Sequence, residues 1–169
     1  MLDITLKGII INVTKRCYIY LKEWVFRLTE KVQDIVQTVV IHASIEKVWQ
    51  KVATSEGIAA WFMPNDFQLE EGHEFHLQGP FGASPCKVIE VDPPKKLTFT
   101  WDLDGWRVSF LLKELENGAT AFTVIHGGWK ESDKTVAKAN EKASIIRERM
   151  NGGWEQIVAK LKAAIESNG

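Results

Sequence analysis

Few residues of this chain have the type and spacing that a metal site, a phosphate-binding loop or another cofactor site needs. His73 and His76 lie three apart in a predicted strand, so their side chains point to opposite faces and cannot share a metal ion. Cys17 and Cys86 are far apart and give no zinc-binding spacing, and we expect both to be reduced thiols. Residues 79–82 lack the Lys and Ser/Thr of a phosphate-binding loop. We therefore expect neither a metal nor another cofactor.

Two polar residues stand out within apolar strand patterns. His126 shares a face with Phe122 and Val124, where a histidine is more often a hydrogen-bonded core residue than a catalytic base. Glu90 shares a face with Val88, and a buried carboxylate is costly unless it is paired. We expect Glu90 on the exposed face; in the inward alternative it would bind a ligand hydroxyl. No catalytic signature accompanies either residue.

The unusual feature of the composition is its aromatic content, seven Trp and eight Phe against two Tyr. Such rings must be buried or bind a partner. Core side chains can themselves form the wall of a cavity, so the two interpretations are compatible. The candidate ligand-binding residues are inward-facing rings and their neighbours: Trp61, Phe75, Phe99, Trp101, Trp106, Phe110, Phe122, Val124, His126, Met150 and Trp154.

The elements that position these residues follow from periodicity and turn signals. Residues 35–41 are rich in β-branched side chains and predict a strand. Ser44 is a good N-cap for a short helix, and residues 54–57 begin a second, which ends near Trp61. The pattern then changes to strand-length segments separated by turn residues, which predicts about six antiparallel strands.

Two hairpins are predicted within these strands, at Asp104-Gly105 and at Asn117-Gly118. Asp102, Asp104 and Arg107 flank the first of them, and we expect all three side chains to be solvated. Turn dipeptides of this kind set the register of the strands on either side, so alternate residues of neighbouring strands should share one apolar face.

A long helix is predicted from about Thr135 to Glu166, where apolar residues recur every three or four positions. Gly152-Gly153 in its middle suggests a bend or a close backbone approach. A sheet with one apolar face needs a cover, and this helix is the one predicted element long enough to provide it. A curved sheet around such a helix encloses space of the kind in which small molecules bind.

Size and charge narrow the class of protein. With 169 residues the chain has the length of one ordinary domain, and its formal net charge of −1 argues against a nucleic-acid binder. The apolar run at residues 8–11 is too short to span a membrane, and no signal-peptide pattern follows it. We expect a cytoplasmic protein that is a monomer or a homodimer.

Five stretches together match a family pattern: residues 38–49 (TVVIHASIEKVW), Ala60-Trp61-Phe62, residues 88–101 (VIEVDPPKKLTFTW), residues 120–126 (TAFTVIH) before Gly-Gly, and Gly153-Trp154 followed by Ile157 and Leu161. They resemble the START-like (SRPBCC) superfamily, whose fold is called helix-grip. Within it they resemble the family named after the activator of the heat-shock chaperone ATPase, the AHSA1-like family. The resemblance covers residues 34–166, and we expect residues 1–33 to be an N-terminal extension, a strand-like piece plus an amphipathic helix. The apolar face of this helix should pack within the chain, and the alternative is a partner site.

The resemblance implies an α+β, helix-grip (START-like, Bet v 1-like) fold. In it, a curved antiparallel sheet of six to seven strands wraps around a long C-terminal helix, with two short helices after the first strand. Members of the superfamily bind lipids, sterols, polyketides or plant phenolics; some are cyclases, and the eponymous member stimulates a chaperone.

We expect a carrier or sensor of a small hydrophobic molecule, aromatic or lipid-like, rather than an enzyme. Two alternatives stay open. One is an enzyme of cyclase, dehydratase or hydrolase type that acts on a similar ligand. The other is a module whose partner is a chaperone with ATPase activity. Residues 1–33 are too short to be the separate chaperone-binding domain that the eponymous member carries, which argues against the second alternative.

Overall fold

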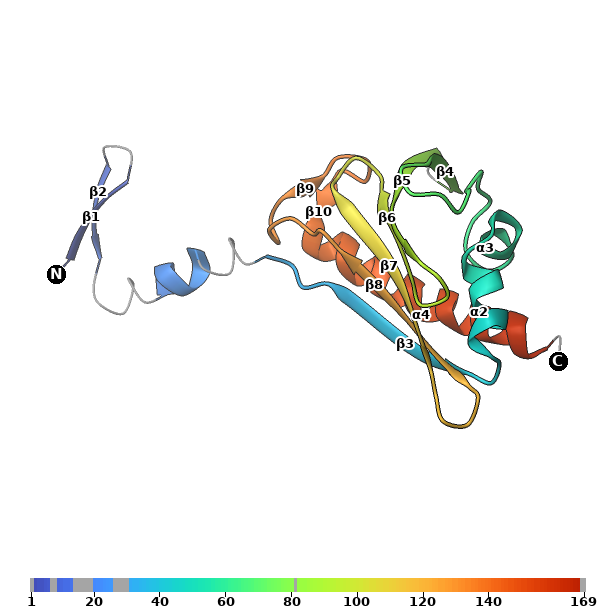
Figure 1. Ribbon diagram of the computed structural model, residues 1–169. Helices are drawn as coiled ribbons and strands as arrows, with labels where there is room; N and C mark the ends of the chain where they lie inside the picture. The colour runs from blue at the N-terminus through green and yellow to red at the C-terminus, as the bar shows by residue number, and fades with distance from the viewer. Residues whose placement is uncertain (1, 7–8, 14–19, 26–30, 81, 168–169) are drawn as a thin grey trace.

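A six-stranded antiparallel sheet forms the centre of the molecule, with strand order β3-β8-β7-β6-β5-β4 (Figure 1). The structure is a computed structural model that describes residues 2–6, 9–13, 20–25, 31–80 and 82–167. The strands are β3 (Ile35–Ile41), β4 (Glu74–Gly79), β5 (Gly82–Asp92), β6 (Lys96–Trp101), β7 (Trp106–Glu114) and β8 (Thr120–Gly127). The first strand of the sheet pairs with the last, and the antiparallel arrangement predicted from the sequence is confirmed.

Both predicted hairpins are present. The turn between β6 and β7 contains Gly105 at φ +84°, and Asp102 at its start also has a positive φ, 61°. Between β7 and β8, Gly118 has φ +73°. Glycine lacks the Cβ that penalises this conformation, so these turns form where the sequence places them. Trp101 is the last residue of β6 and Trp106 is the first residue of β7, so the two are directly paired across the strands.

Two short helices connect β3 to β4, as predicted. They are α2 (Ile45–Val52) and α3 (Ser55–Trp61). The hydroxyl of Ser44 accepts a hydrogen bond from the Lys47 amide at 3.4 Å, and the hydroxyl of Thr54 accepts one from the Gly57 amide at 3.1 Å. These N-caps satisfy amide groups that have no partner inside the helix, and so fix where each helix begins.

The C-terminal helix is shorter than the sequence predicted. Helix α4 spans Ala143–Glu166, and the preceding residues instead form two short paired strands, β9 (Thr135–Val136) and β10 (Glu141–Lys142). Asn140, at φ +52°, turns the chain between them, in a conformation that a helix does not contain. The predicted start at Thr135 is therefore wrong by eight residues, and α4 is about 36 Å long.

The glycine pair inside α4 does not mark a close approach of another backbone. The helix continues through Gly152 and Gly153, and a Cβ built on either residue would meet no atom within 4 Å. The close approach expected there is therefore not found. The space beside Gly153 belongs to a pocket that is described below.

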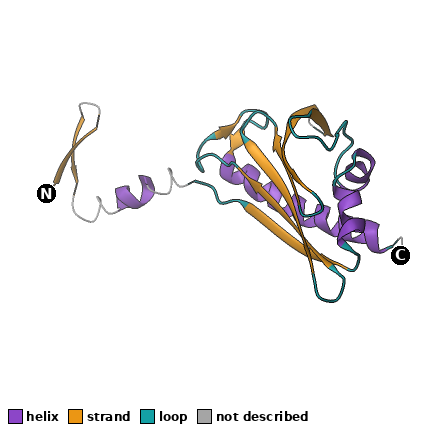
Figure 2. Ribbon diagram, in the orientation of Figure 1, coloured by secondary structure: helices purple, strands orange, loops and turns teal. Residues whose placement is uncertain are grey.

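Helix α4 lies along one face of the sheet, and the hydrophobic core fills the space between them (Figure 2). Alternate residues of β7 and β8 point inward and are buried, including Val108, Phe110, Phe122 and Val124. From α4 the buried side chains include Leu161. The sheet is curved around the helix, so the predicted helix-grip arrangement is confirmed.

The described residues before Lys31 form a two-stranded sheet and a short helical stretch. Strand β1 (Leu2–Leu6) pairs with β2 (Ile9–Val13), and residues 20–25 are helical. Residues 14–19, with the predicted helix start and Cys17, lie outside the described part of the chain. The helical side chains Tyr20, Leu21, Trp24 and Val25 are between 38% and 62% exposed, so the packing expected of this apolar face is not seen for these residues.

Candidate ligand-binding site

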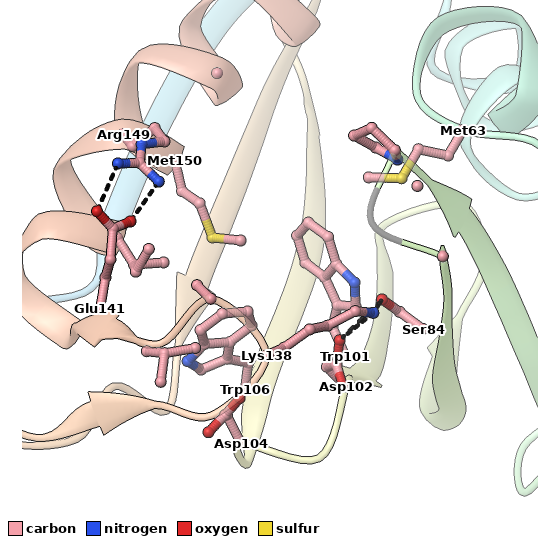
Figure 3. Close-up of a pocket in the computed structure, with 17 residues that line it drawn as sticks. Met63, Ser84, Trp101, Asp102, Asp104, Trp106, Lys138, Glu141, Arg149 and Met150 are labelled. Atoms are coloured by element: carbon pink, nitrogen blue, oxygen red, sulfur yellow. Dashed lines mark hydrogen bonds and ion pairs between the residues drawn. The ribbon is translucent and has the colours of Figure 1, made fainter.

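A pocket of about 620 Å³ lies toward one end of the sheet (Figure 3). Four segments distant in sequence meet there: the β4–β5 hairpin, the β6–β7 turn, the segment from β9 to β10, and the first half of α4. Met63, just after α3, completes the wall. Hairpin tips and two short strands cover this end of the sheet, and the pocket lies beneath them.

The inner wall of the pocket is apolar. Trp101 and Trp106, the paired residues at the ends of β6 and β7, stand edge to face with ring centroids 6.1 Å apart. Aliphatic and thioether side chains complete the surface: Met63, Val136, Ile146 and Met150. Figure 3 shows the sulfur of Met150 directed toward the space above the two indoles. Such a wall suits a ligand with an apolar body.

A charged cluster at the rim ties the β9–β10 segment to the sheet. The Lys138 ammonium donates to Asp102 Oδ2 at 3.0 Å and to Ser84 Oγ at 2.8 Å. Ser84 Oγ in turn donates to Asp102 Oδ2 at 2.9 Å. Burial acts to raise the pKa of Asp102. The hydrogen bonds from Lys138, the Leu103 amide and Ser84 outweigh this effect, so its pKa lies below the ordinary value.

The prediction that Asp102 and Asp104 are solvated is wrong. The side chain of Asp102 is 11% exposed, and that of Asp104 is 7% exposed and 3.1 Å from the Lys130 ammonium. Both carboxylates belong to the pocket lining. Each is partly buried because a lysine from the segment after β8 covers it, and the sequence of the hairpin alone does not contain that partner. Arg107 is exposed, as predicted.

A second ion pair stands at the start of α4. The Arg149 guanidinium donates to both carboxylate oxygens of Glu141, at 2.7 and 3.2 Å. These hydrogen bonds hold the pKa of Glu141 below its ordinary value. Both residues line the pocket and join β10 to the helix. Because the pair is solvent-exposed, it orients the segment more than it stabilises the fold.

His126 is a buried core residue and is not among the residues that line the pocket. Its Nδ1 accepts a hydrogen bond from the indole N–H of Trp154 at 3.0 Å, and its Nε2 has no partner among the described residues. Burial lowers the pKa of His126 to about 3, so the ring is neutral. The nitrogen that a general base would use is thus occupied, and the hydrogen-bonded core position that the sequence favoured is confirmed.

Glu90 is exposed and does not contribute to the pocket. Its carboxylate lies 2.7 Å from the Lys96 ammonium. The register between β5 and β6 shifts between Val88 and Glu90, which is a β-bulge. The exposed orientation is confirmed, and the inward alternative, in which Glu90 would bind a ligand hydroxyl, is wrong.

Three of the sequence-predicted site residues line this pocket: Trp101, Trp106 and Met150. The others are packed in the interior and are not part of its lining: Trp61, Phe75, Phe99, Phe110, Phe122, Val124, His126 and Trp154. Strand alternation tells which side chains point inward, but not how far along the strand the interior stays filled. A ligand-binding role for these eight stays a prediction.

Sequence reasoning missed Ser84 and Lys138 and the whole β9–β10 segment. The predicted helix includes this segment, although the apolar residues that recur at helical spacing begin only at Ala143. Asn140 is the signal that could have separated it, because asparagine tolerates the left-handed backbone conformation found there. Nothing in the sequence near Lys138 predicts its partner Asp102, which is 36 residues away.

The described residues contain neither a candidate metal site nor a candidate membrane-spanning helix. No three His, Cys, Asp or Glu side chains in that part of the chain gather closely enough to hold a metal ion. None of its helices is long and apolar enough to cross a membrane. Cys86 is buried, and this burial raises the pKa of its thiol to about 12.

Solved structures share this architecture. Protein BH1534 from Bacillus halodurans is 52% identical, with a TM-score of 0.75, over 80% of this chain and 98% of that one. Protein MLL2253 from Mesorhizobium loti is 24% identical, with a TM-score of 0.67, over 81% of this chain and 99% of that one. The Aha1 dimer from Colwellia psychrerythraea is 22% identical, with a TM-score of 0.64, over 80% of this chain and 97% of that one. No curated protein matches the chain.

The family comparison covers most of the sheet and all of α4. Residues 42–166 match the family described as activator of Hsp90 ATPase homolog 1-like protein. This span includes the pocket and both ion pairs at its rim. The resemblance drawn from the sequence is therefore confirmed: the chain belongs to the AHSA1-like family, within the START-like (SRPBCC) superfamily.

Proposed function

We propose that the protein binds a small, largely apolar molecule, aromatic or lipid-like, in this pocket and acts as its carrier or sensor. The observation that carries the proposal is the apolar wall built on Trp101 and Trp106 around about 620 Å³ of space. Each 100 Å² of apolar ligand surface buried there contributes about 2.5 kcal/mol to binding. The ion pair of Lys138 with Asp102 holds the segment between β9 and β10 at the mouth of the pocket.

Binding is favoured over catalysis by the state of the polar groups. An enzyme of cyclase, dehydratase or hydrolase type needs an acid or base placed against the substrate. In the pocket, Asp102, Asp104 and Glu141 each have a cationic partner. His126, the candidate base of the sequence, is neutral and accepts from Trp154. These groups are arranged to hold a structure rather than to exchange protons.

A direct experiment is titration with a flavonoid, a fatty acid and a sterol while tryptophan emission is measured. Two of the indoles form the wall, so a ligand in the pocket should change the emission saturably. A response that saturates with none of the three classes would contradict the proposal.

Two glycines of α4 supply a matched pair of variants for this titration. Gly153 lines the pocket and Gly152 does not, and a Cβ on either would meet no atom within 4 Å. We expect Gly153→Leu to fill part of the pocket and weaken binding at least tenfold, and Gly152→Leu to leave binding unchanged. Equal effects of the two substitutions would place the ligand elsewhere. Both remove a helix glycine, so their effects on helix propensity are alike.

A second candidate function is stimulation of a chaperone ATPase, which the family name suggests. The supporting observation is the exposed apolar face of residues 20–25, in which Tyr20 and Trp24 are 59% and 62% exposed. Exposed apolar patches commonly mark protein-binding sites. Measuring the ATPase rate of the cognate Hsp90 with the intact chain, and with Trp24→Ser, tests it. An unchanged rate and no complex would remove this candidate.

We also propose that residues 34–166 form the folded domain and residues 1–33 an extension to it, in a cytoplasmic protein. The family match at residues 42–166 supports this division. One solved relative is described as a dimer, and a monomer and a homodimer are both compatible with the fold. Limited proteolysis with mass spectrometry tests the boundary, and light scattering of the full chain gives the oligomeric state.

A further inference from the structure

The buried tryptophans divide into two groups according to their indole N–H. In the packed interior, Trp61 donates to the Lys51 carbonyl at 3.0 Å, and Trp129 donates to the His126 carbonyl at 2.8 Å. Trp154 donates to His126 Nδ1 at 3.0 Å. This is the usual situation, because a buried donor without an acceptor costs free energy.

The two tryptophans of the pocket wall differ. Trp101 is 8% exposed and Trp106 is 4% exposed, yet neither indole nitrogen has a hydrogen-bond acceptor within the described part of the chain. Neither nitrogen is a fully enclosed atom without a partner, as His126 Nε2 is, and both rings line the pocket. Figure 3 shows the two nitrogens on opposite sides of the ring pair, so each ring offers its own donor.

The neighbouring histidine adds to this excess of donors. His126 Nδ1 accepts from Trp154, so the proton of the neutral ring is on Nε2, which has no partner in the described residues. The His126 ring lies with its centroid 5.2 Å from those of both Trp101 and Trp106. Among the described residues, this end of the interior thus holds three N–H donors that have no acceptor.

The charged groups at the rim are paired with one another. Asp102 Oδ2 accepts from both Lys138 and Ser84, and Asp104 accepts from Lys130. The cations are equally engaged, because Lys138 donates to three oxygens and Arg149 holds Glu141 with two hydrogen bonds. A ligand with a formal charge would therefore compete with an existing ion pair, whereas a neutral acceptor would meet indole donors that have no acceptor among the described residues.

We propose that the ligand is a neutral molecule with an apolar body and at least one acceptor oxygen, a ketone, ester or ether, that accepts a hydrogen bond from the indole N–H of Trp101 or Trp106. The inference rests on the proposed function, since it assigns the ligand class of that same pocket. A ligand without an acceptor would exclude water from these donors without forming a hydrogen bond to them, which lowers its affinity.

A pair of probes of nearly equal size tests this inference. Benzophenone carries a carbonyl oxygen, and diphenylmethane has the same two rings without it. We expect benzophenone to bind roughly three- to tenfold more tightly, as one neutral hydrogen bond provides. In spectra of the full chain labelled with ¹⁵N at tryptophan, benzophenone should shift the indole proton signal of Trp101 or Trp106 downfield. The signals of Trp61, Trp129 and Trp154 should stay in place.

Variants separate the hydrogen bond from the apolar wall. Trp101→Phe and Trp106→Phe each remove one donor and keep an aromatic ring. In the variant that lacks the donor bonded to the ligand, the ratio of the affinities for benzophenone and diphenylmethane should fall to about one. Trp49→Phe, which alters a tryptophan outside the pocket lining, should keep the preference.

The possible outcomes distinguish the two proposals. Equal affinity for the two probes, with no shift of either indole signal, would overturn the inference and leave the apolar pocket intact. Binding of neither probe would overturn the proposed function and the inference with it. A preference that survives both Trp→Phe substitutions would place the acceptor on another donor and would also contradict the inference.

Discussion

Strand β7 contributes to two different regions between sheet and helix, with β8 beside it in one and β6 beside it in the other. At the packed end, Phe110 of β7 and Phe122 of β8 pack with their ring centroids 5.5 Å apart, and Trp61 of α3 lies 5.4 and 5.8 Å from them. At the open end, Trp101 and Trp106 are 6.1 Å apart and border the pocket. Both regions are made of inward-facing aromatic residues from neighbouring strands.

The difference lies in what covers the sheet. Helices α2 and α3 lie over the packed end, where their apolar side chains fill the interior and α2 contacts β7. Two strands of two residues each and two hairpin tips cover the open end. Short segments carry few large side chains, so the interior is left with space. Aromatic content alone therefore does not predict a cavity, because the covering elements decide whether the rings are enclosed by protein or border a pocket.

The largest expected effect contrasts the two ends directly. Phe110→Ala should lower the free energy of unfolding by about 3–5 kcal/mol, because it leaves a cavity among close-packed rings. Met150→Ala at the open end should cost less than about 2 kcal/mol, since the side chain already borders empty space. Urea denaturation measures both. Equal losses would show that the two ends are packed alike.

The second prediction concerns His126, which joins the two regions by contacting Trp101 and accepting from Trp154. Its pKa is about 3 in the folded protein and about 6.5 in the unfolded chain. Above pH 6.5 the ring is neutral in both states. Below pH 6.5 the unfolded chain binds a proton that the folded protein does not, so stability falls, by about 1.5 kcal/mol between pH 6.5 and 5.

His126→Gln is the control for this prediction, because glutamine offers an acceptor for the Trp154 N–H but does not titrate. The difference in the free energy of unfolding between the two proteins should narrow as the pH falls over that range. The two proteins share every other titratable group, so the contributions of those groups largely cancel in the difference. A constant difference would mean that His126 is not shielded from protonation.

The third prediction tests the ion pair at the open end. Lys138→Met removes the cation over Asp102 and should cost about 1 kcal/mol, because the pair is only partly buried. The pKa of Asp102 should rise, since burial remains and the opposing hydrogen bond is gone. Denaturation and a carboxyl NMR titration measure the two effects. An unchanged pKa would show that Lys138 does not hold the β9–β10 segment over the pocket.

The smallest effect is expected for an ion pair outside both regions. Glu90→Gln removes the exposed contact with Lys96 and should change the free energy of unfolding by less than about 0.5 kcal/mol, with ligand binding unaltered. It is the surface counterpart of Lys138→Met. A loss as large as that of Lys138→Met would contradict the view that burial at the pocket rim gives the Lys138 pair its strength.

The elements of the domain could be predicted because their signals are local. Ser44 caps α2 through an amide three residues away, and Gly105 and Gly118 turn the hairpins by their own backbone conformation. Alternation in β7 and β8 then gives the inward face. In residues 135–142 the local signal was weak, and extending the helix back from its periodic residues predicted the wrong element there.

What the sequence by itself determined is therefore the order of the elements, the antiparallel sheet and the set of inward-facing residues. The tertiary structure alone decided which of these rings are enclosed and which border the pocket. It also brought Lys138 to Asp102 and Trp154 to His126, across 36 and 28 residues. These pairings depend on where separate segments come to rest after the sheet closes around α4, and no short stretch of sequence contains that information.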